Sequence, residues 1–114
     1  MHLVFYTNNV KPGFAGQANA FVIRIRPEYK EDKGLLEHEK VHVKQFWRTL
    51  GLHGLFYLLS KKYRLKAETE AYREQLCWPP AIAERAKCLD HYSNFLSQKY
   101  GLNITAAEAR KLLS

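Results

Sequence analysis

Two histidines that stand four residues apart, His38 and His42, could bind one metal ion. The segment around them is predicted to be helical, and residues four apart on a helix lie on the same face. Both imidazoles can then reach a single zinc ion at the usual distance of about 2.0–2.1 Å. Glu39 follows the first histidine, where its carboxylate can reach a zinc-activated water without displacing either ligand. The pattern H-E-x-x-H therefore predicts a catalytic zinc site with Glu39 as general base.

The same pattern can also arise by chance on an amphipathic helix. For five histidines and nine glutamates in 114 residues, the chance expectation is roughly 0.02 occurrences. At 100° per residue, the three motif residues share an arc of about 160° with apolar neighbours such as Leu35 and Val43, so they face the core. Buried imidazoles and a carboxylate are unfavourable unless something pairs them, as a divalent cation would.

A catalytic zinc site usually has three protein ligands, so a third must come from elsewhere in the chain. On the predicted helix 64–78, Glu68 falls within about 60° of an apolar stripe, whereas Glu70 falls on the opposite, charged side. A lone carboxylate in such a stripe is more often solvated at its edge, but the upstream motif favours Glu68 as the third ligand. The other candidates are His53, Glu74, Glu84, Asp90, His91 and Glu108.

A three-histidine site that includes His53 is the alternative. The longer motif H-E-x-x-H-x-x-G-x-x-H fails, because position 45 is Gln and position 48 is Arg. His53 is therefore predicted to cap a helix or lie at the surface. His2 and His91 have no partner at ligand spacing and are interpreted as ordinary histidines.

The segments "HEKVH" and "ETEAY" together resemble the gluzincin family of zincin metallopeptidases, in which a glutamate from a later helix completes the site. The short chain looks especially like the minigluzincins and like short zincin-type proteins of bacteriophages. The resemblance covers residues 35–72. It implies His38, His42 and Glu68 as zinc ligands, and Tyr72, four residues after Glu68, as a residue beside them and a candidate for catalysis.

The resemblance further implies a zinc-dependent endopeptidase or amidase acting on a peptide or protein. It implies that strand 21–26 lies above the motif helix and binds an extended substrate by strand addition. Lys40 departs from the family pattern but points away from the site on the helical wheel. Four residues are candidates for stabilising the transition state: Tyr72, Tyr63, Arg64 and His53.

The elements that would position these residues form one α+β domain over residues 1–114, mostly helical with a minor N-terminal sheet. Strands are predicted at 3–6 and 21–26, with a long loop at 7–19 between them. The motif helix is predicted to begin after the N-cap Asp32 and to run to Leu50. Further helices are predicted at 53–63, 64–78 and 80–100, and a last one opens with the capping box of Thr105 and Glu108.

Composition narrows the function classes. The net charge of +7 invites a nucleic-acid partner, but the basic cluster of residues 61–66 is short and lacks a nucleic-acid-binding motif, so a solvated face is favoured. No apolar run could span a membrane, and the N-terminus lacks a secretory signal, so we expect a cytoplasmic protein without membrane contact, in the host cytoplasm if it is phage-encoded. Cys77 and Cys88 are expected as free thiols.

Two alternatives to the peptidase stay open. One is a protein of the same fold that binds zinc for a structural or interaction role, without turnover. The other is a basic nucleic-acid-binding domain in which the H-E-x-x-H pattern is a coincidence; it predicts no stoichiometric zinc and a nucleic-acid affinity that falls steeply with salt.

Overall fold

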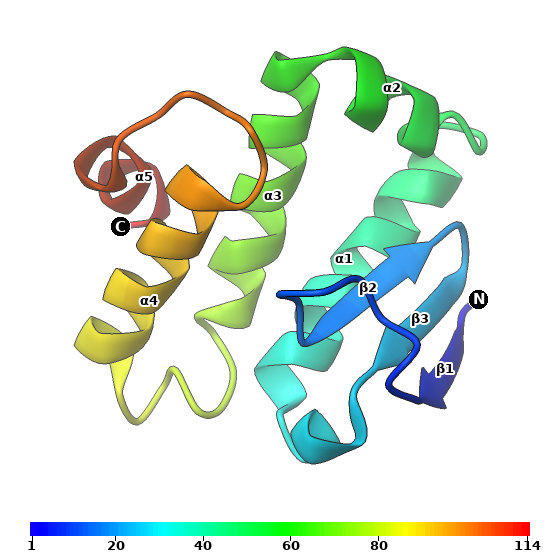
Figure 1. Ribbon diagram of the computed structural model, residues 1–114, viewed down its shortest axis with the longest axis horizontal. Helices are drawn as coiled ribbons and strands as arrows, with labels where there is room; N and C mark the ends of the chain where they lie inside the picture. The colour runs from blue at the N-terminus through cyan, green and yellow to red at the C-terminus, as the bar shows by residue number, and fades with distance from the viewer.

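The N-terminal part of the chain forms a three-stranded sheet in the computed structural model, which describes residues 1–114 (Figure 1). The strands are β1 (Leu3–Tyr6), β2 (Gly16–Asn19) and β3 (Val22–Ile25), in the order β1-β3-β2. β3 pairs in parallel with β1 and antiparallel with β2. The central strand is therefore β3, and β2 forms an edge.

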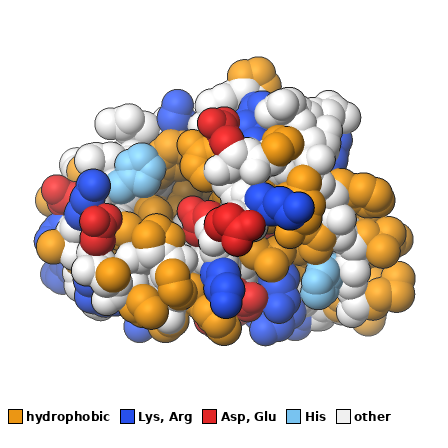
Figure 2. Space-filling model, turned by 90° about the horizontal axis from the view of Figure 1, so that it is seen from below, with side chains coloured by type: hydrophobic (Ala, Val, Ile, Leu, Met, Phe, Trp, Pro, Cys, Tyr) orange, Lys and Arg blue, Asp and Glu red, His pale blue; other side chains and the backbone are white.

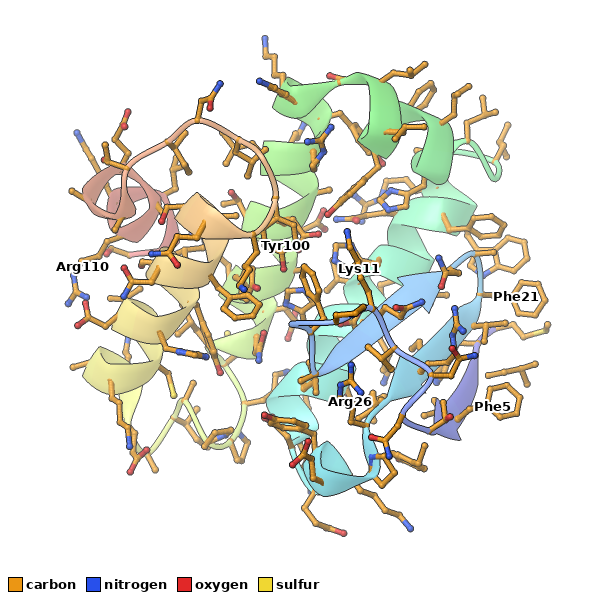
Figure 3. All side chains as sticks on the ribbon, viewed as in Figure 1. Phe5, Lys11, Phe21, Arg26, Tyr100 and Arg110 are labelled. Carbon is orange, nitrogen blue, oxygen red and sulfur yellow. The ribbon has the colours of Figure 1, made fainter.

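The predicted loop 7–19 was wrong at its end, because β2 lies within it. The segment "GQAN" contains no β-branched or aromatic residue, so its strand conformation comes from tertiary pairing with β3. Arg26, which follows β3, donates hydrogen bonds to the carbonyls of loop residues Asn8, Val10, Lys11 and Phe14 (Figure 3). It holds the loop against the end of β3.

The motif helix is α1 (Lys33–Arg48), which follows a short 3-10 turn, η1 (Pro27–Tyr29). Asp32 caps it as predicted, since its side chain accepts a hydrogen bond from the Leu35 amide. The helix ends at Arg48 rather than at Leu50, because Leu50 and Gly51 both take positive φ values, 54° and 87°. These two left-handed residues turn the chain into α2.

The remaining helices are α2 (His53–Leu59), α3 (Lys61–Gln75), α4 (Arg85–Gln98) and α5 (Ala106–Leu113). The break between α2 and α3 falls at Ser60, whose hydroxyl caps α3 by accepting from the Tyr63 amide, so the predicted boundary at residue 63 was wrong. The start predicted for α4 at Pro80 was also wrong, because residues 80–84 form turns that place Ala81 in the core. The capping box of Thr105 and Glu108 is confirmed.

Two hydrophobic clusters make up the core. A cluster of ten buried residues fills the space among α3, α4 and α5, and includes Leu76, Leu96 and Leu113. A smaller cluster of Ile23, Ile25, Leu35 and Val43 joins the sheet to α1. The two clusters meet where α1 packs against α3, and the motif residues lie at this seam.

These elements confirm the α+β class, with the small sheet packed on the motif helix (Figure 1). Cys77 is exposed and Cys88 buried, and both are free thiols as expected. None of the helices combines the length and the apolar character needed to cross a membrane.

Candidate metal centre

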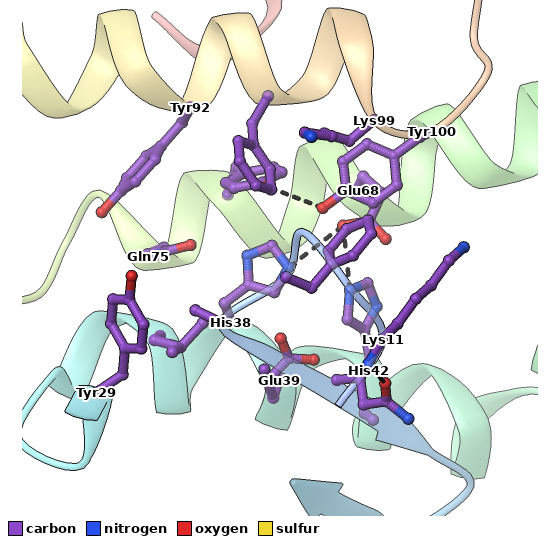
Figure 4. A pocket seen from close by; sticks show the side chains of 18 of the residues that line it. Lys11, Tyr29, His38, Glu39, His42, Glu68, Gln75, Tyr92, Lys99 and Tyr100 are labelled. Atoms are coloured by element: carbon purple, nitrogen blue, oxygen red, sulfur yellow. Dashed lines mark hydrogen bonds and ion pairs between the residues drawn. The ribbon is translucent and has the colours of Figure 1, made fainter. Parts of the chain in front are cut away.

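Three side chains converge at the seam between α1 and α3. His38 and His42 come from successive turns of α1 and Glu68 comes from α3, and all three are buried. One ligand atom from each lies within 4.8 Å of the others. Figure 4 shows both imidazoles pointing at the Glu68 carboxylate. The group could bind a metal ion, and Glu70, which points to the Arg48 side chain, does not belong to it.

Two of the three distances within this group match the ligand separations around a tetrahedral ion. The Nε2 atoms of His38 and His42 lie 3.3 and 3.2 Å from Oε1 of Glu68. These distances are longer than the usual 2.7–2.9 Å of a charge-assisted hydrogen bond. Ligands at about 2.05 Å from a tetrahedral centre are about 3.3 Å apart, which is the separation seen here.

The electrostatics of the metal-free group couple the two helices. Burial alone would lower the pKa of His42, but the charge and hydrogen bond of Glu68 outweigh it and raise this pKa to about 9. Burial would raise the pKa of Glu68, but both histidines outweigh it and hold it well below its ordinary value. A proton on His42 thus occupies the place that a cation would take.

A chain of hydrogen bonds fixes the orientation of His42 from behind. Gln45 donates from Nε2 to the carbonyl of Ala67 and to Glu70, so its Oε1 must be the atom that faces His42. The Nδ1–H group of His42 donates to this oxygen over 2.8 Å, which leaves Nε2 to face Glu68. Arg48 in turn forms an ion pair with Glu70. Such outer contacts typically set the tautomer of a metal-binding histidine.

The other two ligands are held differently. The hydroxyl of Tyr57 donates to Oε2 of Glu68 over 2.5 Å, which leaves Oε1 directed at the two histidines. The ring of His38 packs against Tyr72, with ring centroids 4.4 Å apart, and its Nδ1 has no hydrogen-bond partner. His38 is therefore positioned by packing, and His42 by hydrogen bonding.

Glu39 lies beside the cluster but is not part of its ion pairs. Burial raises its pKa, an effect that the nearby His38 and His42 partly offset. Its carboxylate accepts no hydrogen bond from the protein and lines the cleft. Gly16 of β2 lies directly above it: a Cβ added there would be 3.5 Å from Oε2 of Glu39. The same Cβ would lie 3.3 Å from the Arg24 carbonyl and from the Ile25 side chain, so the glycine allows β2 to pack closely on β3 over Glu39.

The centre opens into a cleft of about 1800 Å³ between the sheet and α4. Its floor carries the three converging side chains and Glu39, and one wall is β2. Lys11 and Lys99 lie at its rim, near Tyr100 (Figure 4). Its volume exceeds the range of about 300–1,000 Å³ that is usual for small-molecule pockets.

The structure assigns contacts to the four candidates for stabilising the transition state. The hydroxyl of Tyr72 is hydrogen-bonded to that of Tyr100, and Arg64 donates to three backbone carbonyls, so the polar groups of both are engaged within the fold. Tyr63 is hydrogen-bonded to Nδ1 of His53. His53, expected as a cap or surface residue, instead lines the cleft with its ring centroid 5.8 Å from that of His42.

Burial and the nearby His42 lower the pKa of His53 to about 4, so His53 is neutral at pH 7. Because its Nδ1 is bonded to Tyr63, its Nε2 is the nitrogen left for a ligand in the cleft. Of the four candidates, His53 is the one whose polar group remains available there.

Three residues of the site escaped the sequence analysis. Gln45 stands three positions after His42 on the same face of the helix, a spacing that could have identified it. Tyr57 and Gly16 gave no such signal, because their approach to Glu68 and Glu39 depends on how α2 and β2 pack.

Comparisons with known proteins give no relative from which a role could be transferred: no protein-family model, no curated protein and no solved structure matches the chain. The function is therefore inferred from the residues of the site.

Proposed function

We propose that the protein is a zinc-dependent metallopeptidase of the gluzincin type, an endopeptidase or amidase. The observation that supports it best is the convergence of His38, His42 and Glu68 in a cleft, with a buried, unbonded Glu39 beside them. Two neutral nitrogen ligands and one carboxylate form the donor set typical of catalytic zinc. Zinc held there would supply a Lewis acid that lowers the pKa of a water to about 7 and polarises a substrate carbonyl.

Glu39 would then take the proton from the attacking water and return it to the leaving amine. Its raised pKa suits this exchange, because a carboxyl with a pKa nearer to neutral both accepts and releases a proton readily. Neutral His53 would donate a hydrogen bond from Nε2 to the oxygen on which negative charge develops.

The substrate would extend along β2, not along strand 21–26 as the family resemblance implied. β3 is paired on both sides, so it has no free edge for a peptide. In the antiparallel pair, the Arg26 amide donates to Ala15, and bonding alternates along the strand. The polar groups of Gly16 and Ala18 therefore face away from β3, toward the cleft that both residues line. Strand addition at this edge would place a peptide carbonyl above Glu39.

The metal assignment is tested by zinc content. Plasma mass spectrometry should find about one zinc per chain in the wild type and in Glu70→Ala, and little in Glu68→Ala. Glu70→Ala is the matched control, because it removes a carboxylate two residues away that contacts Arg48 and Gln45 but no metal ligand. A wild type without zinc after expression in zinc-supplemented medium would refute the assignment.

The peptidase assignment is tested with Glu39→Gln, since the amide keeps the shape of the carboxylate but cannot take up a proton. Hydrolysis of a fluorescent casein or of a mixed peptide library should be lost while zinc stays bound. A wild type that binds zinc but cleaves no peptide would support the alternative of a structural zinc protein. In that case the zinc would stabilise the packing of α1 against α3. Unchanged hydrolysis in Glu39→Gln would remove Glu39 from its role.

A further inference from the structure

The outer surface of α2 is apolar and exposed. No residue of α2 is buried. The exposed fractions are 72% for Leu58, 74% for Leu59 and 91% for Leu50 in the preceding turn. We call this surface the leucine crest; it comprises Leu50, Leu52, Leu55, Phe56, Leu58 and Leu59. It extends onto Trp47, which is exposed and stacks on Phe21.

The segment of the sequence that contains this crest is rich in positive charge, although Lys40 and Arg48 within it form ion pairs with Glu37 and Glu70. Residues 40–67 contain seven lysines and arginines and no acidic residue, whereas the rest of the chain has eleven of each sign. The net charge of +7 thus lies entirely in this segment. Lys61 and Lys62 directly follow the crest at the start of α3, and both are exposed and form no ion pair. An anionic surface is the complementary partner.

The crest protrudes from the molecule, which favours a lipid layer as its partner over a macromolecule with a fixed surface shape. On α2 the apolar side chains from Leu55 to Leu59 cover an arc of about 160°, at 100° per residue. Figure 1 shows α2 at one end of the molecule, crossing the ends of α1 and α3. An apolar projection of this kind can enter a lipid layer, which adapts to any contour, and flanking lysines would reach the headgroups.

A polynucleotide fits the crest less well, because a nucleic-acid footprint is a basic stripe without protruding leucines. Figure 2 shows the face opposite α2, where positive, negative and apolar side chains are intermixed.

We infer that the leucine crest and its flanking lysines bind the surface of an anionic phospholipid membrane. The contact is peripheral, so it needs no membrane-spanning segment. It replaces the expectation from the sequence that the protein makes no contact with a membrane. The other side of the same helix faces the metal centre, where Tyr57 and His53 line the cleft. Membrane binding would therefore hold the cleft close to the lipid surface, where it would meet peptide segments that emerge from or lie on the membrane.

Vesicle flotation tests this inference without reference to zinc or hydrolysis. The full chain should float with vesicles of phosphatidylcholine mixed with phosphatidylglycerol, and bind vesicles of phosphatidylcholine alone at least about tenfold more weakly. Leu58→Ser with Leu59→Ser should weaken binding to the mixed vesicles roughly tenfold or more. Lys61→Gln with Lys62→Gln should lower binding to the mixed vesicles and remove most of its salt dependence.

The matched control is Ile82→Ser with Lys111→Gln, which removes an exposed apolar group and an exposed charge far from α2 in the sequence and should bind like the wild type. Glu39→Gln should also float normally, so that failure of the peptidase proposal and failure of this one are distinguishable. The inference is overturned if the wild type does not float with mixed vesicles, or if the control loses binding equally. It is also overturned if duplex DNA binds at Lys61 and Lys62 in preference to vesicles, or if light scattering shows a dimer that Leu58→Ser with Leu59→Ser dissociates.

Discussion

Gln45 offers the sharpest test of how the fold positions its metal ligands. It is buried and forms three hydrogen bonds: it accepts from His42 over 2.8 Å, and donates to the Ala67 carbonyl over 3.1 Å and to Glu70 over 3.0 Å. Gln45→Met preserves the length and volume of the side chain but removes all three bonds. The substitution therefore releases the ring of His42 while changing little of the packing.

The expected loss can be worked out from these contacts. The two bonds to His42 and Ala67 are buried and contribute about 1 kcal/mol each, and the bond to the partly exposed Glu70 contributes less. The metal-free protein should therefore lose about 2 kcal/mol of unfolding free energy. Removing an outer contact of a metal-binding histidine typically weakens metal affinity 10–100-fold, or about 1.4–2.7 kcal/mol.

Zinc affinity is measured by competition with a chromophoric chelator, and stability by urea unfolding of the metal-free protein. Gln75→Met is the matched control, because Gln75 is a buried glutamine that lines the same cleft but contacts no proposed ligand. A Gln45→Met protein that binds zinc within twofold of the wild type would refute the role of Gln45. An equal loss of affinity in both variants would attribute the effect to general destabilisation.

Four further predictions concern the same centre. Because His42 has a pKa of about 9 and must lose its proton to bind zinc, affinity should rise with pH up to about 9, and calorimetry in different buffers should count about one proton released; a pH-independent affinity would contradict this. The stability of the metal-free protein should instead fall as pH rises. The contribution of protonated His42 is complete below pH 6.5 and is lost as pH rises through about 9, which thermal unfolding would detect. Tyr57→Phe should weaken zinc binding several-fold because Glu68 loses its 2.5 Å donor, whereas Tyr63→Phe should not, and equal effects would remove Tyr57 from its role. Gly16→Ala should retain zinc but lower hydrolysis several-fold, since its Cβ would lie only 3.3 Å from the Arg24 carbonyl and from the Ile25 side chain and would shift β2 over Glu39, whereas Gly54→Ala meets no atom within 4 Å and should leave hydrolysis unchanged.

The parts of the fold that the sequence predicted are those specified by a few consecutive residues. Asp32 and Thr105 cap their helices through bonds to amides three positions on, so the local sequence suffices. β2 could not be predicted, because its residues have low strand propensity and its position depends on pairing with β3. The ends of α1 and α4 were misplaced because the turns at Leu50 and after Pro80 are set by tertiary packing.

The proposed ligands could be chosen before the structure because α1 and α3 are regular helices. Helical periodicity placed His38 and His42 on one face and separated Glu68 from Glu70, and the structure brings the first three together. The residues around Glu39 could not be predicted from helical periodicity. Gly16 reaches it through the register of β2, and His53 lines the cleft because of the turn before α2. Periodicity identifies faces of helices, whereas the cleft is formed by loops and a strand of low propensity.

Glu39 is the residue that best separates a catalytic centre from a structural one. A structural role for zinc accounts for His38, His42 and Glu68, and for the bonds that Gln45 and Tyr57 make to them, because together they link α1 to α3 between the two hydrophobic clusters. It does not account for a largely buried carboxylate that lines the cleft without a hydrogen bond to the protein and whose pKa is raised by desolvation. Glu39→Gln should therefore raise the thermal stability of the zinc-loaded protein while abolishing hydrolysis, as is common where a functional residue is strained or unpaired. A Glu39→Gln protein that is less stable than the wild type would instead give the carboxylate a structural role.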